Sequence, residues 1–116
     1  MRINEAIYDY LESVRKKNSL TLDQIATESR RFGSTWTPGF ISGMKRNATA
    51  ASLPNLLLLA RTIESLTGTD VVLPDLFIGS GDVELTDTVS ISREELRKAL
   101  SGNFFTLEEK TTAMSE

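Results

Sequence analysis

Residues 21–47, TLDQIATESRRFGSTWTPGFISGMKRN, contain two helix start signals separated by a basic turn. Thr21 and Gln24 have the spacing of a capping box, in which the side chain of each residue bonds the backbone N–H of the other. Thr37 and Pro38 repeat a start signal, because a hydroxyl caps the first turn of a helix and proline is tolerated within that turn. The stretch therefore predicts two short helices joined by a turn.

Each predicted helix has one face that is expected to point inward. The residues of these faces recur at helical spacing; they are Leu22, Ile25, Ala26 and Ser29 in the first helix and Phe40, Ile41 and Met44 in the second. Asn47 is expected to end the second helix, because asparagine tolerates the left-handed conformation found at helix ends.

Further helices are predicted on both sides of this pair. Residues 4–17 form the clearest one, since one continuous face carries Ile3, Ala6, Ile7, Tyr10, Leu11 and Val14. Ser52 and Pro54 begin a fourth helix, LPNLLLLARTIESL, which Gly68 ends. Residues 73–78, again with proline in the first turn, predict a fifth helix.

The pattern changes after the fifth predicted helix. Residues 79–82, GSGD, are typical of a linker, and residues 83–91, VELTDTVSI, alternate apolar and polar side chains as a strand does. Ser92 and Glu95 form a second capping box, which predicts a helix to about Leu100. A strand and helix of this size cannot fold alone, so we expect the unit to dock on the helical domain or on a partner.

The expected organisation has four parts. They are a helix-turn-helix domain, a linker, a strand-helix extension and a flexible tail, at residues 1–78, 79–82, 83–107 and 108–116 respectively. The expected fold class is mainly α, with five helices in the first part.

Composition excludes several classes of function. The 116 residues include no cysteine and no histidine, so disulfides, thiol and Ser-His nucleophiles and the usual zinc ligands are absent. We therefore expect no enzyme and no cofactor. No apolar run approaches the roughly 20 residues of a membrane span, and residues 1–10 contain acids where a signal peptide is apolar. These features predict a soluble, cytoplasmic protein that does not bind membranes.

Charge is divided unequally between the two halves of the chain. The formal net charge is −3, yet residues 1–61 contain nine Lys or Arg against five Asp or Glu, and residues 62–116 contain four against eleven. The basic half includes the predicted helix-turn-helix. Because attraction to phosphates depends on the local field, DNA binding is compatible with an acidic total, although such asymmetry is also common without any function.

The succession of helices resembles the lambda-repressor-like helix-turn-helix family, also called the XRE or Cro type, of phage and bacterial regulators. The resemblance covers residues 4–78 and is carried by Leu11, Arg15, Ile25, Ala26, Thr37, Ile41, Met44 and the segments SLPNLLLLARTIE and LPDLF. It implies a compact five-helix domain whose third helix lies in the major groove of double-stranded DNA. It also implies a homodimer on a pseudo-palindromic operator.

This chain departs from the family pattern at the positions that meet DNA. Leu22 stands where family members often have glutamine, and the turn between the two central helices is about three residues longer than usual. The usual base-contacting positions are Pro38, Gly39 and Gly43, which have no side chain able to recognise a base. Base recognition would then come from the helix entrance, from Ser42 or from arginines, while the glycines allow close approach of the backbone.

The candidate DNA-binding residues follow from this arrangement. They are Arg30, Arg31, Ser34, Thr35, Trp36, Thr37, Gly39, Ser42, Gly43, Lys45 and Arg46. We expect the four cations to contact phosphates, with solvation of a helix end or interaction with its dipole as the competing explanation. For Trp36, burial under the turn and contact with a sugar or base are equally expected.

The extension supplies candidate contacts with a second copy or another protein. These apolar residues are Val89, Ile91, Leu96, Leu100, Phe104 and Phe105, and packing within the chain is the alternative for each. The favoured function is a sequence-specific DNA-binding transcriptional regulator, a repressor of phage or mobile-element type that occludes a promoter. The alternative is a protein-binding module, such as an antitoxin or anti-repressor, that acts through the acidic C-terminal half.

Overall fold

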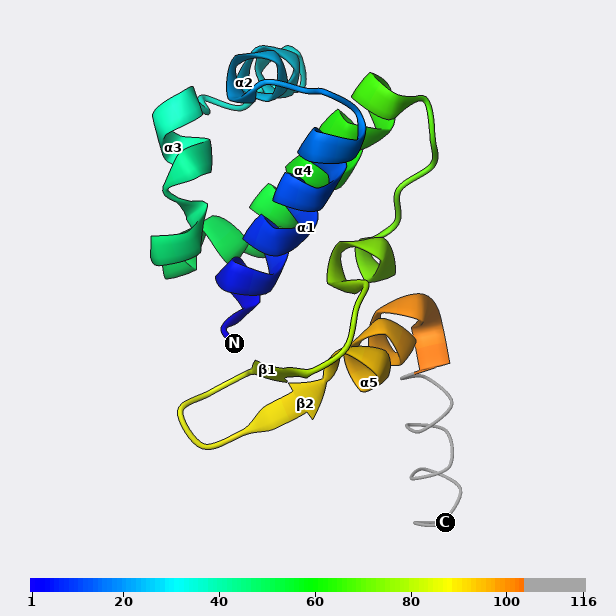
Figure 1. Cartoon of the computed structure of the whole chain (residues 1–116). Helices are drawn as coiled ribbons and strands as arrows, with labels where there is room; N and C mark the ends of the chain where they lie inside the picture. Colours follow the sequence, from blue (N-terminus) through cyan, green and yellow to red (C-terminus); the bar gives the residue numbers. More distant parts are fainter. Residues whose placement is uncertain (104–116) are drawn as a thin grey trace.

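The computed structural model describes residues 1–103 and is mainly helical, with a small two-stranded sheet (Figure 1). Its α-helices are α1 (Ile3–Lys17), α2 (Leu22–Arg31), α3 (Pro38–Ser42), α4 (Leu53–Thr67) and α5 (Arg93–Lys98). The 3-10 turns are η1 (Met44–Arg46), η2 (Ala48–Ala51) and η3 (Leu73–Phe77), and η4 (Ala99–Asn103) is a π-type turn. The strands are β1 (Asp82–Glu84) and β2 (Ser90–Ser92). In this part of the chain, no helix is both long and apolar enough to cross a membrane.

The two helix start signals of residues 21–47 are confirmed, whereas Ser52 forms no side-chain cap bond at α4 and the predicted box at α5 has only the bond from the Glu95 N–H to Ser92 Oγ. In α2, the Gln24 backbone N–H donates to Thr21 Oγ1 at 3.1 Å, and the Thr21 N–H donates to Gln24 Oε1 at 2.8 Å. In α3, the Phe40 N–H donates to Thr37 Oγ1 at 3.1 Å. At the end of α4, Gly68 takes the left-handed conformation, with φ of 71°.

One apolar core joins the helical region to the C-terminal extension. α2 packs against α3 and α4, while α1 packs against η1, η2 and η3. The largest completely buried apolar side chains are Ile7, Leu11, Ile25, Ile41, Met44, Leu59, Ile63, Leu76 and Val83. Because Val83 lies on β1, the extension belongs to the same core as the helices.

The second central helix is shorter than the sequence predicts. α3 ends at Ser42, and the chain continues into η1 instead of remaining helical to Asn47, whose φ of −118° is extended and not left-handed. Gly39 and Gly43 weaken a helix by about 1 kcal/mol each relative to alanine. The buried Asn4 side-chain amide also donates hydrogen bonds to the Met44 and Lys45 carbonyls of η1. The prediction of a continuous helix over 38–47 is therefore wrong.

The extension contains a hairpin where one strand was predicted. β1 and β2 pair antiparallel, with Val83 opposite Ile91, and residues 85–89 between them form the turn. Thr86 Oγ1 accepts the backbone N–H groups of Thr88 and Val89, which stabilises the reversal of the chain. The alternating apolar and polar residues of 83–91 thus belong to two short strands and the turn between them, and not to one strand. Residues 73–78 also differ, since they contain a 3-10 turn instead of an α-helix.

The hairpin and α5 are docked on the helical region by named contacts. The Glu84 N–H donates to the Met1 carbonyl at 2.8 Å, and Arg97 Nη1 donates to the carbonyls of Phe77 and Gly79 at 2.6 and 2.9 Å. β1 already begins at Asp82, so the last residue of the predicted linker lies in the sheet. The extension therefore docks within the chain.

The residues predicted to contact a second copy or another protein differ in burial once the extension is docked. Leu96 packs against the core and so acts within the chain, and Ile91 is half-buried. Val89 and Leu100 remain 50% and 38% exposed. Phe104, Phe105 and the tail over 108–116 lie outside the described residues.

Candidate nucleic-acid interface

The turn between α2 and α3 is held by contacts within the chain. Arg30 Nη1 donates to the Trp36 carbonyl at 2.7 Å, and Ser34 Oγ accepts the Trp36 N–H at 3.2 Å. The Ser34 hydroxyl also lies 2.6 Å from that of Ser29. Two predicted DNA contacts, Arg30 and Ser34, thus stabilise the turn itself.

Trp36 is buried, with 5% of its surface exposed, and its ring stacks on Phe40 at 5.6 Å between centroids. Of the two alternatives for this side chain, the structure shows burial. Its indole is not available to a base or sugar, so the placement of Trp36 among the DNA-binding residues is corrected. The physical reason is that this large aromatic ring gains more by packing under the turn than by facing water.

Arg31 is engaged by a carboxylate on its own helix. Arg31 Nη1 donates to Glu28 Oε1 at 2.6 Å, and Ser65 Oγ donates to Glu28 Oε2 at 2.8 Å. The hydrogen bond from Ser65, followed by that from Arg31, lowers the pKa of Glu28. Arg61 also stacks over the Phe32 ring at 4.9 Å. The field of Arg31 is therefore partly neutralised by an adjacent carboxylate.

The second basic pair, Lys45 and Arg46, is different. Both residues lie on η1 and are exposed, and neither side chain forms a hydrogen bond or ion pair with the residues of the described range. Together with Ser42, Glu5 and Tyr8 they line an open hollow of about 470 Å³. Lys45 and Arg46 are therefore available to an anionic ligand.

Asn4 fixes the backbone beneath this pair. Its side chain is 5% exposed, and its Nδ2 donates to the carbonyl of Met44 at 3.0 Å and to that of Lys45 at 2.8 Å. The sequence reasoning did not identify Asn4 as a site residue. A signal was present, because positions 4, 7, 11 and 14 share the apolar face of the first helix and only position 4 is polar.

A polar network on α1 adjoins the same surface. Tyr8 Oη donates to Glu12 Oε1 at 2.8 Å, and Arg15 Nε donates to Glu12 Oε2 at 2.6 Å. The hydrogen bond to Glu12 is the main reason that the pKa of Tyr8 is raised, and the bond from Arg15 is the main reason that the pKa of Glu12 is lowered. Arg46 is near enough to oppose the rise of the Tyr8 pKa. The network balances its own charges and leaves Arg46 without a direct partner in it.

The remaining predicted DNA-binding positions differ in exposure and in the groups that they leave accessible. Thr35, Gly39 and Ser42 are exposed, and Ser42 Oγ donates to the Gly39 carbonyl at 3.1 Å. A Cβ built on Gly39 would meet nothing closer than Thr37 Oγ1 at 3.8 Å, so the backbone there is open to close approach. Thr37 is exposed but caps α3, and Gly43 is half-buried at the end of that helix. This surface thus presents only a few small polar groups and the open backbone at Gly39.

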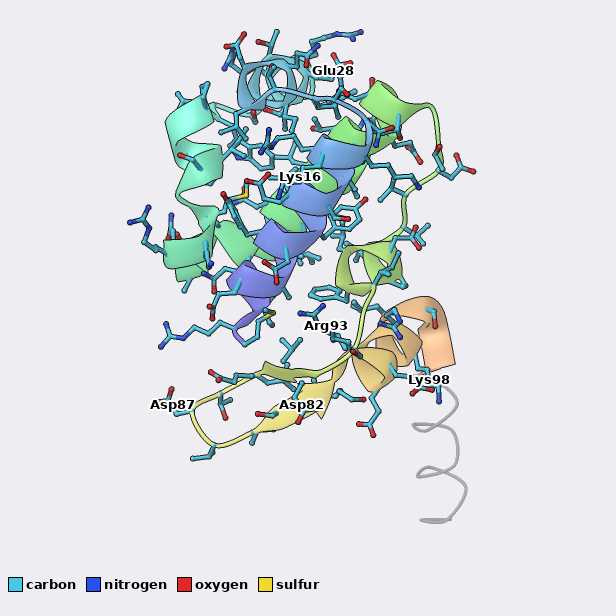
Figure 2. The ribbon with its side chains drawn as sticks, viewed as in Figure 1. Lys16, Glu28, Asp82, Asp87, Arg93 and Lys98 are labelled. Atoms are coloured by element: carbon cyan, nitrogen blue, oxygen red, sulfur yellow. The ribbon has the colours of Figure 1, made fainter. Side chains whose placement is uncertain are left out.

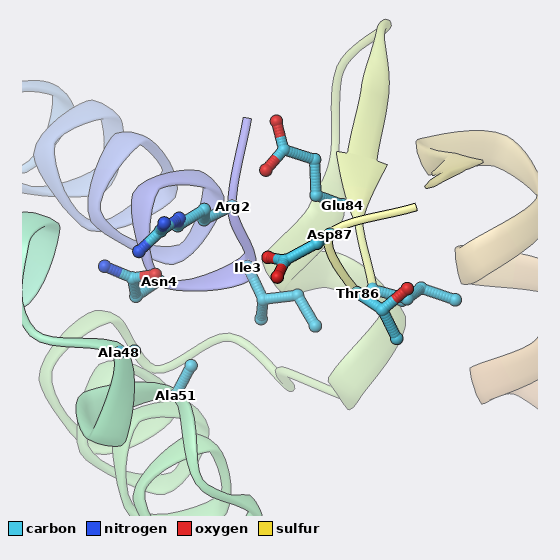
Figure 3. A pocket seen from close by; sticks show the side chains of 9 residues that line it. Arg2, Ile3, Asn4, Ala48, Ala51, Glu84, Thr86 and Asp87 are labelled. Atoms are coloured by element: carbon cyan, nitrogen blue, oxygen red, sulfur yellow. The ribbon is translucent and has the colours of Figure 1, made fainter. Parts of the chain in front are cut away.

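A second hollow, of about 350 Å³, lies between the start of α1, η2 and the hairpin (Figure 3). Its charged lining residues are of both signs, Arg2 with Glu84 and Asp87, and its apolar lining includes Ile3 and Leu85. Within residues 1–103, no three His, Cys, Asp or Glu side chains are placed to hold a metal ion. The exposed η1 cations are therefore the stronger candidate site.

No protein-family model, curated protein or solved structure matches the chain.

Proposed function

We propose that the chain is a sequence-specific DNA-binding regulator of transcription with a helix-turn-helix of the lambda-repressor-like type. The observation that carries this proposal is the exposed pair Lys45 and Arg46, which Asn4 holds beside Ser42. Cations without intramolecular partners on a fixed backbone suit phosphate oxygens, which receive most protein–DNA contacts. In this proposal the regulator represses by occupying a promoter.

The proposed division of labour separates affinity from selectivity. Lys45 and Arg46 contact phosphates and position α3, while Thr35, Ser42 and the Gly39 backbone approach base edges in the major groove. The short helix α3 cannot extend along the groove, so each half-site provides few base contacts. We therefore propose that two copies bind one operator, with half-sites roughly 34 Å apart on one face of the DNA.

In vitro selection of bound sequences from random DNA tests this function. We expect the intact chain to enrich one short motif, arranged as two related half-sites. The variants Thr35→Ala and Ser42→Ala should relax the preference at one or two base pairs, at a cost of about 1–3 kcal/mol each. The matched control is Asp70→Asn, an exposed position distant from α3, which should leave the motif unchanged. Failure to enrich any motif would contradict the proposal.

A further inference from the structure

The hollow between the start of α1, η2 and the hairpin combines apolar walls with charges of both signs. Its volume of about 350 Å³ lies within the range of small-molecule pockets, roughly 300–1,000 Å³. Its apolar lining comes from Ile3, Ala48, Ala51 and Leu85. Because two of these side chains are only methyl groups, the η2 side of the hollow has room for a hydrocarbon group.

Asn4 presents an unpartnered oxygen to this hollow. Asn4 is 5% exposed, and its Nδ2 donates to the carbonyls of Met44 and Lys45. A side-chain amide also has an acceptor oxygen, and Asn4 Oδ1 accepts no hydrogen bond from residues 1–103. Since the nitrogen faces η1, the oxygen faces away from η1, and Figure 3 shows it on the side nearer Ile3. A buried side chain thus directs a free acceptor toward the hollow.

Two oppositely charged side chains border the hollow without pairing with each other. Figure 3 shows the ends of Arg2 and Asn4 on one side of the hollow and the Asp87 carboxylate on the other side. Within the described range, neither Arg2 nor Asp87 belongs to an ion pair, whereas Glu84 Oε1 lies 3.5 Å from the Met1 amino nitrogen. Arg2 is therefore available to a carboxylate, and Asp87 to an ammonium group.

This mixed lining restricts the class of ligand. A metal cation would be repelled by Arg2, and a phosphate would be repelled by Asp87. A zwitterion is attracted by both, because a guanidinium pairs well with a carboxylate, and carboxylate and amide oxygens accept the N–H groups of an ammonium. The apolar walls add a place for a small hydrocarbon side chain.

We propose that this hollow binds a free α-amino acid with a small apolar side chain. The carboxylate of the ligand pairs with Arg2, and its ammonium donates to Asp87 and to Asn4 Oδ1. Its side chain packs against Ile3 and the methyl groups of η2. Every polar group of the ligand then has a partner of opposite character in the chain.

Asn4 connects this hollow to the backbone of η1. The amide that accepts from the ligand also donates to the Met44 and Lys45 carbonyls. Hydrogen bonds in such a chain polarise one another, so a donor on Asn4 Oδ1 strengthens the two bonds that hold η1. Binding in the hollow therefore reaches η1, whether or not η1 contacts DNA.

A titration of the isotope-labelled full chain with L-valine, followed by amide chemical shifts, tests the site without DNA. We expect saturable shifts at residues 2–4, 48–51 and 84–87, and smaller ones at residues 44–46 through Asn4. Isobutylamine lacks the carboxylate of L-valine and isovalerate lacks its ammonium, so each should bind at least about tenfold more weakly. No saturable shift with L-valine, or equal binding of L-valine and either of these compounds, would overturn the proposal.

Substitutions in the hairpin locate the site. Asp87→Asn should weaken L-valine binding about tenfold, because it removes the charge that faces the ammonium. Asp82→Asn is the matched control: Figure 2 places Asp87 at the tip of the hairpin and Asp82 away from it, and Asp82 does not line the hollow. Both aspartates are exposed, so both variants should keep the fold, which urea unfolding checks. Equal affinities of the two variants for L-valine would overturn the proposal.

Discussion

Two basic pairs lie near α3, and the structure treats them differently. Arg30 and Arg31 follow each other at the end of α2, where one donates to the Trp36 carbonyl and the other pairs with Glu28. Lys45 and Arg46 follow each other on η1, with no partner for either side chain among residues 1–103. In sequence the two pairs are equivalent. In the fold, the first stabilises a turn and the second forms an available cationic surface.

The difference teaches how neighbouring acceptors decide the role of a cation. The lengthened turn brings a backbone carbonyl within reach of Arg30, and the helical spacing of Glu28 and Arg31 allows an ion pair three residues apart. On η1, the buried Asn4 amide already satisfies the nearest carbonyls, so they do not require Lys45 or Arg46. Asn4 thus anchors the backbone of η1, while the side chains of Lys45 and Arg46 have no partner among residues 1–103.

The largest expected effect comes from removing this asparagine. Asn4→Leu leaves the Met44 and Lys45 carbonyls without their donor, and each unsatisfied buried group costs about 1–3 kcal/mol. We expect the free energy of unfolding in urea to fall by roughly 2–4 kcal/mol. Asn18→Leu, the same change at an exposed asparagine, is the control and should cost much less. A loss for Asn4→Leu no larger than that control would refute the anchoring role.

A smaller effect on stability should distinguish the two basic pairs. Arg30→Ala removes the donor to the Trp36 carbonyl, so the free energy of unfolding should decrease by about 1 kcal/mol. Lys45→Ala removes no intramolecular bond of the described residues and should change stability by less than about 0.5 kcal/mol. Thermal and urea unfolding of both variants provide the comparison. Equal stability losses would mean that the pairs do not differ in structural role.

The smallest effect concerns acid stability. Because hydrogen bonds from Ser65 and Arg31 lower the pKa of Glu28 below its ordinary value of 4.5, this carboxylate adds stability above pH 4.5. That contribution is lost as the pH falls through the lowered pKa. Urea midpoints between pH 7 and pH 3 should therefore decrease less in Glu28→Gln than in the intact chain. Ser65→Ala should reduce the pH dependence in the same direction, and an unchanged dependence in both variants would contradict these bonds.

Local features of the fold could be predicted from the sequence, because the interacting residues are close along the chain. The capping residues Thr21, Gln24 and Thr37 act within three positions, and the left-handed conformation of Gly68 ends α4 as expected. The early end of α3 has one local signal, the helix-weakening residues Gly39 and Gly43, but the hydrogen bonds from Asn4, about forty positions away, could not be read from the sequence.

The candidate site was predictable in part. Lys45 and Arg46 were predicted as accessible cations, and both are exposed in the structure. The sequence could not show that Arg30 would donate to a backbone carbonyl in the lengthened turn. Burial of Trp36 depends on how that turn folds over Phe40, which periodicity does not specify. The hairpin was missed because both strands alternate and the turn between them lacks glycine and proline.

The most direct test measures how the affinity for selected operator DNA depends on salt. The slope of the logarithm of the binding constant against that of salt concentration falls by about one unit for each phosphate contact removed. Lys45→Ala with Arg46→Ala should reduce the slope by about two units, and the control pair Lys16→Ala with Lys17→Ala should leave it unchanged. Arg30→Ala with Arg31→Ala, measured where the chain remains folded, should also preserve the slope. An unchanged slope in the first pair, or an equal reduction in the arginine pair, would contradict the assignment of the η1 cations as the DNA-binding surface.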